Sequence, residues 1–205
     1  MDRMPFIITI FIMLLGPIRL IPAFAKITRG YDAAFKRKAA IGGTLIAVAI
    51  GLFVAMSGHG LVEKYEVSFP SLELAGGLIL LLSALRTIFP VLQPDTPVQP
   101  NMSPTHFALS PLATPTMISP MGIAAILLFV MLEGAYPGIT RAVIIVFLSV
   151  MAVNFLVIYF HDQLLKIPGL VPIIQLVGAI LVVMQVALAV DTMIEALTVL
   201  GVVKA

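Results

Sequence analysis

The sequence predicts an all-α membrane protein of six transmembrane helices, built as two inverted-topology three-helix repeats with broken first and fourth helices. Three observations predict this fold class. Hydrophobic residues make up 60% of the 205 positions and charged residues only 11%, whereas soluble domains average about 25% charged residues. Six apolar segments can each cross a bilayer, and two of these segments carry paired prolines. In hydrocarbon the backbone must satisfy its own hydrogen bonds, as helices do.

The first segment, residues 5–25, contains Gly16-Pro17 and Pro22. Its apolar start and Ala23-Phe24-Ala25 imitate a cleaved signal peptide. Arg19 and the prolines interrupt the segment, and the charge that precedes it is weak. We therefore expect it to be retained as the first span.

The other five segments follow in order, and each meets the requirement of about 20 largely apolar residues. The second covers residues 39–56, and its small residues recur every four positions, a pattern that lets another helix approach closely. The third covers residues 72–89. The fourth, residues 107–132, is broken by three prolines. The fifth and sixth cover residues 142–160 and 172–200.

One connection divides the chain near its middle. Residues 90–104 contain five prolines and a single charged residue, Asp95, a composition typical of an extended, semi-rigid linker. We expect a first repeat at residues 1–89, a Pro-rich linker at 90–106 and a second repeat at 107–205.

The loop after the first span predicts the orientation, because cytoplasmic loops carry an excess of Lys and Arg. This loop holds five basic residues, and no other loop holds more than two. Placing it in the cytoplasm puts both termini outside the cytoplasmic membrane.

The repeat is visible in two pairs of spans. Pro17 and Pro22 of the first span match Pro115 and Pro120 of the fourth at an offset of 98 residues. The third and sixth spans match at an offset of 102 residues, which places Gly76 over Gly178. A unit of three spans that is duplicated in one chain inserts its second copy upside down, as in many secondary transporters.

The broken spans predict the functional site. Each proline removes a backbone N–H donor, and the freed carbonyls must bind protein, water or a polar solute. In inverted-repeat transporters such breaks meet at the midplane of the bilayer. We expect a substrate site formed by Gly16, Pro17, Arg19, Pro22, Pro115, Ser119, Pro120 and Gly122.

Several blocks of the sequence resemble the MarC family (UPF0056-type) of integral membrane proteins. They are Gly16-Pro17 through Phe24, Pro111 through Pro115 with Ser119 through Gly122, Leu74 through Gly77, and Ala187 through Glu195. The resemblance covers essentially the whole chain. It implies six spans and kinship with small neutral amino acid transporters and with LysE-type exporters. The chain departs from the family pattern at Gly16, Arg19, Leu20, Ser119 and Met121.

Arg19 is the sharpest candidate for the chemistry, because an Arg inside a span costs about 2.5–3.5 kcal/mol and needs a partner. Three interpretations are open. It snorkels to the nearby headgroups, it pairs with Asp162, or it binds an anionic group such as a substrate carboxylate.

The remaining polar residues favour structural roles. Asp191 and Glu195 are expected to be solvated, with proton coupling as the alternative. Asn154, Gln175 and Gln185 are expected to bond between helices. The chain has no Cys, and its three His residues do not lie at ligand spacing, so we expect no metal and no cofactor.

The sequence therefore predicts a transporter or exporter of a small solute that is not an enzyme. Its expected partners are the lipid bilayer, the solute, a coupling ion (H⁺ or Na⁺) and further copies of itself, but no nucleic acid. A non-transporting sensor or assembly factor is the first alternative. An intramembrane enzyme, suggested by Ser57-Gly58-His59, is the second.

Overall fold

A computed structural model describes residues 3–89, 102–134 and 136–203. Helices account for nearly all of these residues, and this part of the chain contains no strand. In order along the chain the elements are α1 (Arg3–Leu15), α2 (Pro17–Ile27), α3 (Ala33–Lys64), α4 (Phe69–Ile88), α5 (Pro104–Phe107), η2 (Ala108–Met117), α6 (Pro120–Met131), η3 (Leu132–Gly134), α7 (Ile139–Tyr159), α8 (His161–Leu164) and α9 (Leu170–Val199).

The predicted all-α membrane fold is confirmed by the length and apolar composition of these helices, which supply five to six candidate spans. Five long segments can each cross a bilayer: Ile7–Ile27, Ala33–Gly60, Phe69–Ile88, Ile139–Tyr159 and Leu170–Val199. The pair Pro104–Met117 and Pro120–Met131, bent by 60°, forms a sixth span if it is counted as one.

Many large apolar side chains point outward from the bundle. Leu45, Phe53, Leu176 and Val183 are each more than 60% exposed. In water such a surface would drive aggregation, but a lipid bilayer solvates it. The exposed surface of the long helices is therefore the surface that faces lipid.

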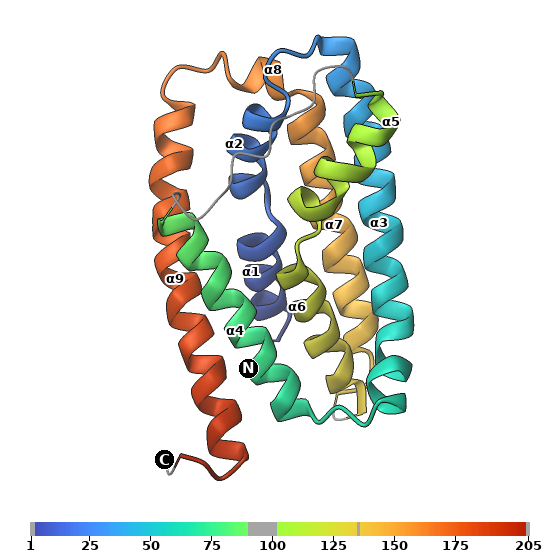
Figure 1. Ribbon diagram of the computed structural model, residues 1–205, viewed down its shortest axis with the longest axis vertical. Coiled ribbons are helices and arrows are strands. Elements are labelled where there is room, and N and C mark those ends of the chain that lie inside the picture. The colour runs from blue at the N-terminus through green and yellow to red at the C-terminus, as the bar shows by residue number, and fades with distance from the viewer. Residues whose placement is uncertain (1–2, 90–101, 135, 204–205) are drawn as a thin grey trace.

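The two broken spans occupy the middle of the bundle (Figure 1). Helices α3 and α7 pack against each other on one side, and α4 and α9 pack against each other on the other. The first broken span, α1 with α2, contacts α7 and α6, and the second, η2 with α6, contacts α3. The long helices thus enclose the irregular backbone at membrane depth, where it would otherwise meet lipid.

Close helix packing depends on the small residues noted in the sequence. Ala39 and Ala47 of α3 are fully buried. A Cβ at Gly43 would collide with Leu112 of η2, and one at Gly51 would collide with the Phe147 ring of α7. The small-residue face of α3 therefore packs within the chain, against both η2 and α7.

The two ends of the bundle differ in charge. One end, called the basic end below, carries Lys26, Arg29, Lys36, Arg37 and Lys38, where α2 ends and α3 begins. Helix α8 lies at this end, whereas α9 finishes at the opposite end (Figure 1). Six of the ten acidic residues lie toward the opposite end: Glu63, Glu66, Glu73, Glu133, Asp191 and Glu195.

The predicted linker, residues 90–106, lies mostly outside the described residues, which resume at residue 102. Helix α5 begins at Pro104, three residues before the predicted start of the second repeat. Ser103 explains this earlier start, because its side chain accepts a hydrogen bond from the backbone N–H of His106 and caps the helix. Pro104 follows at the first helical position, where its fixed φ suits a helix.

Candidate functional site

The breaks in the two central spans border one cavity of ≈150 Å³. The first span supplies the end of α1 and the first two turns of α2, and the second supplies η2 and the residue that precedes α6. The lining residues are Leu14, Leu15, Gly16, Arg19, Leu20, Ala23, Pro115, Thr116 and Ser119. The expectation that the two breaks lie together is met in this structure.

Gly16 forms the first break. It is extended (φ −74°, ψ 169°) because a residue that precedes proline is disfavoured in the helical region. A Cβ at this position would collide with the backbone carbonyl of Ile12, so only glycine fits. Pro17 then starts α2 at the first helical position. Gly16 has no side chain with which to cap the N–H groups of the first turn.

Two side chains, one from the first turn of α2 and one from α7, satisfy carbonyls that the first break frees. Arg19 Nη1 donates to Leu14 O at 3.3 Å, and Asn154 Nδ2 of α7 donates to Leu15 O at 2.6 Å. Asn154 is fully buried. Its Oδ1 has no hydrogen-bond partner among the described residues. The amide therefore bonds between helices as the sequence predicts, and it does so at the break itself.

Arg19 lies half-buried in the cavity. Its Nη2 also reaches Ser83 Oγ of α4 at 3.5 Å. Among the described residues no carboxylate forms an ion pair with it, and Asp162 pairs with Lys36 Nζ at 2.8 Å. Two interpretations from the sequence are therefore wrong here. The guanidinium does not pair with Asp162, and it turns back toward Leu14 instead of snorkelling to the headgroups at the basic end.

The second break is held by its own residues. Ser110 and Thr114, which precede prolines, are extended inside η2. Thr116 Oγ1 donates to Pro111 O at 2.7 Å. In a helix this carbonyl would accept from the N–H of residue 115, but Pro115 has no N–H. Ser119 caps α6 by accepting from Gly122 N at 3.2 Å.

Two helix N-termini consequently meet the cavity, those of α2 and α6. A helix N-terminus carries about half a positive elementary charge from its free N–H groups. With the Arg19 guanidinium, which stays protonated at any physiological pH, these termini make the cavity electropositive. The arrangement is suited to a small anionic group.

Four of the eight predicted site residues line the cavity: Gly16, Arg19, Pro115 and Ser119. The other four lie outside it. Pro17 faces an apolar groove against α7. Pro22 is an exposed residue inside α2. Pro120 starts α6, and Gly122 packs against Leu15, because a Cβ there would collide with that side chain. These four shape the backbone around the cavity and do not border it.

The helix starts fall in a register different from the one that the prolines predict. Helices α2 and α6 begin at Pro17 and Pro120, which are 103 residues apart. This spacing agrees with the 102 residues between Gly76 and Gly178 and not with the 98 between Pro17 and Pro115. The physical counterpart of Gly16-Pro17 is therefore Ser119-Pro120. The inverted duplication itself stays a prediction.

A second cavity of ≈160 Å³ lies on the other side of Leu14, which lines both cavities. It lies between α1, α4, α6 and α9 and is mostly apolar. Glu73 of α4 and Glu195 of α9 border it toward the end opposite the basic end. Leu14 and the buried Met121 border its inner part, and Gln185 Nε2 contacts the sulfur of Met121 at 3.3 Å.

The remaining polar residues occupy ordinary positions. Gln185 Nε2 donates to Leu80 O at 2.9 Å, so this amide bonds between helices as predicted, whereas Gln175 is exposed. Asp191 and Glu195 are exposed, which fits the solvated interpretation. His59 is exposed beside Glu63. No group of three potential metal ligands exists among the described residues.

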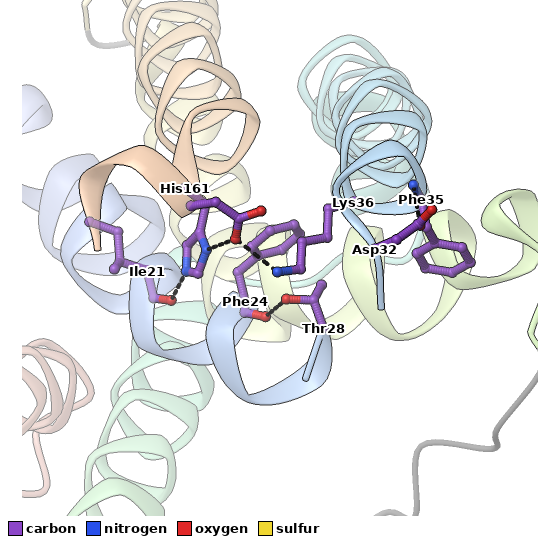
Figure 2. A network of polar contacts seen from close by, with 8 residues as sticks. Ile21, Phe24, Thr28, Asp32, Phe35, Lys36 and His161 are labelled. Atoms are coloured by element: carbon purple, nitrogen blue, oxygen red, sulfur yellow. Dashed lines mark hydrogen bonds and ion pairs between the residues drawn. The ribbon is translucent and has the colours of Figure 1, made fainter. Parts of the chain in front are cut away.

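Two features of the site are not predicted by the sequence. Ser83 of α4 contacts Arg19 but is an ordinary residue of a predicted span. His161 directly follows the fifth predicted span, yet it is only 2% exposed and contacts α2 (Figure 2). The only signal for the Ser83 contact was that Arg19 needed a partner. Nothing in the sequence shows that His161 is buried.

Comparisons with known proteins agree with the resemblance in the sequence. A family model described as "MarC family integral membrane protein" matches residues 4–197. The UPF0056 membrane protein YvbG of Bacillus subtilis is 30% identical over 171 residues, which are 76% of each chain. No solved structure is detectably similar.

Two Escherichia coli relatives are named as inner membrane proteins. The UPF0056 inner membrane protein YhgN is 23% identical over 183 residues, covering 88% of this chain and 90% of its own length. The UPF0056 inner membrane protein MarC is 24% identical over 128 residues, 58% of each chain. The matched residues of this chain include both broken spans, since the family model extends over all six.

Proposed function

Because the chain belongs to the MarC family of integral membrane proteins, we propose that it transports a small carboxylate-bearing solute, such as a small amino acid, across the cytoplasmic membrane. The observation that carries this proposal is Arg19, an arginine inside the bundle that lines the cavity between two helix breaks and pairs with no carboxylate among the described residues. A cation at membrane depth without a counter-ion is costly, and a bound anion lowers that cost.

The size of the cavity limits the solute. A cavity of about 150 Å³ accommodates a molecule as large as benzene. The cavity between the breaks has this volume. Its apolar lining by Leu14, Leu15, Leu20 and Ala23 suits a short apolar portion, and Arg19 suits a carboxylate at the other end of the solute.

Two cavities in series support transport over a purely structural or sensory role. The cavity at the breaks and the cavity between α4 and α9 share the wall residue Leu14. A solute could pass between them if the end of α1 moved, which is an alternating-access motion around a fixed site. We place the basic end in the cytoplasm and both termini outside, with H⁺ or Na⁺ as the coupling ion and a homo-oligomer as the assembled form.

Uptake into proteoliposomes tests the proposal. Arg19→Ala should abolish uptake of the solute without preventing insertion into the membrane, and Arg19→Lys should retain part of it because the charge stays. Arg141→Ala removes an exposed arginine at the start of α7 and should leave uptake unchanged. Wild-type uptake by Arg19→Ala would refute the proposed role of the cavity.

The solute itself can be found without a transport assay. A panel of amino acids and short-chain carboxylates is added to the purified protein, and its melting temperature is measured. Ligands that bind only the folded state raise the melting temperature. A rise with one class of solute, absent in Arg19→Ala, would identify that class. A flat response to the whole panel would count against a carboxylate site.

A further inference from the structure

The cavity between α4 and α9 differs in its chemistry from the cavity at the breaks. Its volume is ≈160 Å³, and a cavity of about 150 Å³ accommodates a molecule as large as benzene. Every residue that lines it is apolar except Glu73, Thr192 and Glu195. Sites for small molecules are typically lined in this way, with mostly apolar walls and a few polar groups that orient the ligand. The lining therefore suits a small molecule with a hydrocarbon part and one polar end.

The two carboxylates of this cavity come from helices that run in opposite directions. Helix α4 starts at the end of the bundle where α9 finishes (Figure 1). Glu73 is the fifth residue of α4, and Glu195 is the fifth residue from the end of α9. At a rise of about 1.5 Å per residue, each lies about 6 Å from its helix end. Gly77, one turn after Glu73, packs against Met193 of α9, so both carboxylates lie at about the same level.

Both carboxylates lack a cationic partner. Among the described residues no Lys, Arg or His forms an ion pair with Glu73 or Glu195. Glu73 is half-buried and lies within a membrane span, where an unpaired carboxylate is costly. Two like charges that border one cavity also repel each other. A cation bound from outside the protein would lower both costs.

The polar side chains of this cavity match an ammonium group better than a metal ion. Thr192 donates its hydroxyl hydrogen to Leu188 O at 2.8 Å, so its oxygen can still accept a hydrogen bond. Carboxylates only accept. A protonated primary amine carries one positive charge and three N–H donors, as the side chain of lysine does. A metal ion would leave the apolar walls unused, and the described residues hold no group of three potential ligands for one.

We propose that this cavity binds a small amphipathic amine, with its ammonium group between Glu73 and Glu195 and its hydrocarbon chain directed inward toward Leu14 and Met121. Because the two carboxylates belong to different helices, the bound amine also ties α4 to α9. The site is separate from the cavity at the breaks, where Arg19 suits an anionic group. It does not rest on the proposed transport of a carboxylate, since each cavity has its own charge and its own ligand chemistry.

Butylammonium is the probe for this site, because a primary amine stays protonated at neutral pH. The melting temperature of the purified protein is measured over a concentration series at constant ionic strength, which gives the affinity. Butyrate and 1-butanol have the same chain without the positive charge, and each should bind at least about tenfold more weakly. Equal binding of butylammonium and 1-butanol would overturn the proposal, since the carboxylates would then contribute nothing.

Substitutions of the carboxylates test the position of the ammonium group. Glu73→Gln keeps the shape of the side chain but removes its charge, and it should weaken butylammonium binding at least about tenfold. Glu195→Gln, at an exposed position, should weaken it about two- to fivefold. Glu66→Gln is the matched control, because Glu66 is exposed in the loop between α3 and α4 at the same end of the bundle. The proposal fails if the variant with both Glu73→Gln and Glu195→Gln binds as tightly as Glu66→Gln.

The length of the amine tests the apolar part of the cavity. In the parent protein, affinity should rise about fourfold for each methylene added between methylammonium and butylammonium, because each added group is buried. Ala124 borders the cavity and is nearly buried. Ala124→Leu should therefore fill the apolar part and abolish this rise while both carboxylates remain. Methylammonium that bound the parent as tightly as butylammonium would indicate a plain cation site and would contradict the proposal.

Arg19→Ala separates this site from the proposed transport function. Arg19 borders the other cavity, so butylammonium should bind this variant as tightly as it binds the parent protein. Loss of butylammonium binding in Arg19→Ala would place the amine at the breaks and overturn the proposal. Butylammonium binding without uptake of any carboxylate would refute the transport function and leave the amine site intact. Uptake without butylammonium binding would do the reverse.

Discussion

The two helix breaks that border the central cavity are held in different ways. At the first, Gly16 excludes any side chain, and the carbonyls of Leu14 and Leu15 accept hydrogen bonds from Arg19 and Asn154. Asn154 is 139 residues away in the chain. The first break thus depends on a residue of another span and on a charged group that also faces the cavity.

The second break is self-contained. Ser119 caps α6, Thr116 replaces the N–H that Pro115 lacks, and Thr114 Oγ1 donates to Leu109 O at 3.3 Å. Each bond spans five residues or fewer. A local set of bonds keeps its geometry when neighbouring helices move, whereas a set that spans helices does not. We therefore expect the first break to be the adjustable half of the site and the second to be the fixed half.

The largest effect is expected for Gly16→Ala. The added Cβ collides with the backbone carbonyl of Ile12, which cannot move without disturbing α1. Overpacking of this kind costs about 1–3 kcal/mol, and we expect the upper part of that range. Thermal unfolding in detergent measures it. Gly60→Ala is the control, because a Cβ there meets nothing within 4 Å, and an equal loss for both variants would contradict the steric account.

Asn154→Leu should have the next largest effect. It keeps the approximate volume but leaves Leu15 O without its donor, at a cost of about 1–2 kcal/mol. The matched control is Gln175→Leu, which removes an exposed amide of α9. A loss for Asn154→Leu no greater than for Gln175→Leu in the same unfolding assay would mean that the first break does not depend on α7.

Ser119→Ala tests the second break and should cost about 1 kcal/mol, as for an ordinary N-terminal cap. Ser68→Ala, which removes the corresponding cap of α4, should cost about the same. Both melting temperatures are measured under identical conditions. If Ser119→Ala proved more damaging than Asn154→Leu, the contrast between the two breaks would be reversed.

The smallest effect is expected for Thr116→Val, at about 0.5 kcal/mol. The isosteric change removes the hydroxyl that bonds Pro111 O, but the Ser119 cap still holds the same break. Its melting temperature should lie close to that of the parent protein. A loss comparable with that of Gly16→Ala would show that the second break has no redundancy.

The spans were predictable because hydropathy and proline position are properties of the sequence itself. The fifth span was expected at residues 142–160 and is observed at Ile139–Tyr159. The sequence pairs Pro17 with Pro115, whereas the helix starts pair Pro17 with Pro120, because both prolines of a pair look alike in the sequence. Pro120 starts a helix, since Ser119 caps it, whereas Pro22 follows Ile21, which has no capping group, and α2 continues through it.

The partners of the site residues needed the three-dimensional structure. Arg19 could be singled out because a charge in a span is costly. Its contact with Ser83 depends on how α2 lies against α4, which hydropathy does not specify. The burial of His161 depends in the same way on the turn that folds α8 over α2.

The pairing of α4 with α9 has a consequence for how the protein is made. Within the described residues this pair makes the most extensive helix contact, and a Cβ at Gly77 would press on Met193 at 2.5 Å. At a synthesis rate of about 5–20 residues per second, α9 emerges several seconds after α4. Until then the glycine face of α4 lacks its partner in the membrane. Biogenesis must therefore hold the preceding spans in an incomplete bundle until α9 arrives and closes the wall of the cavity between α4 and α9.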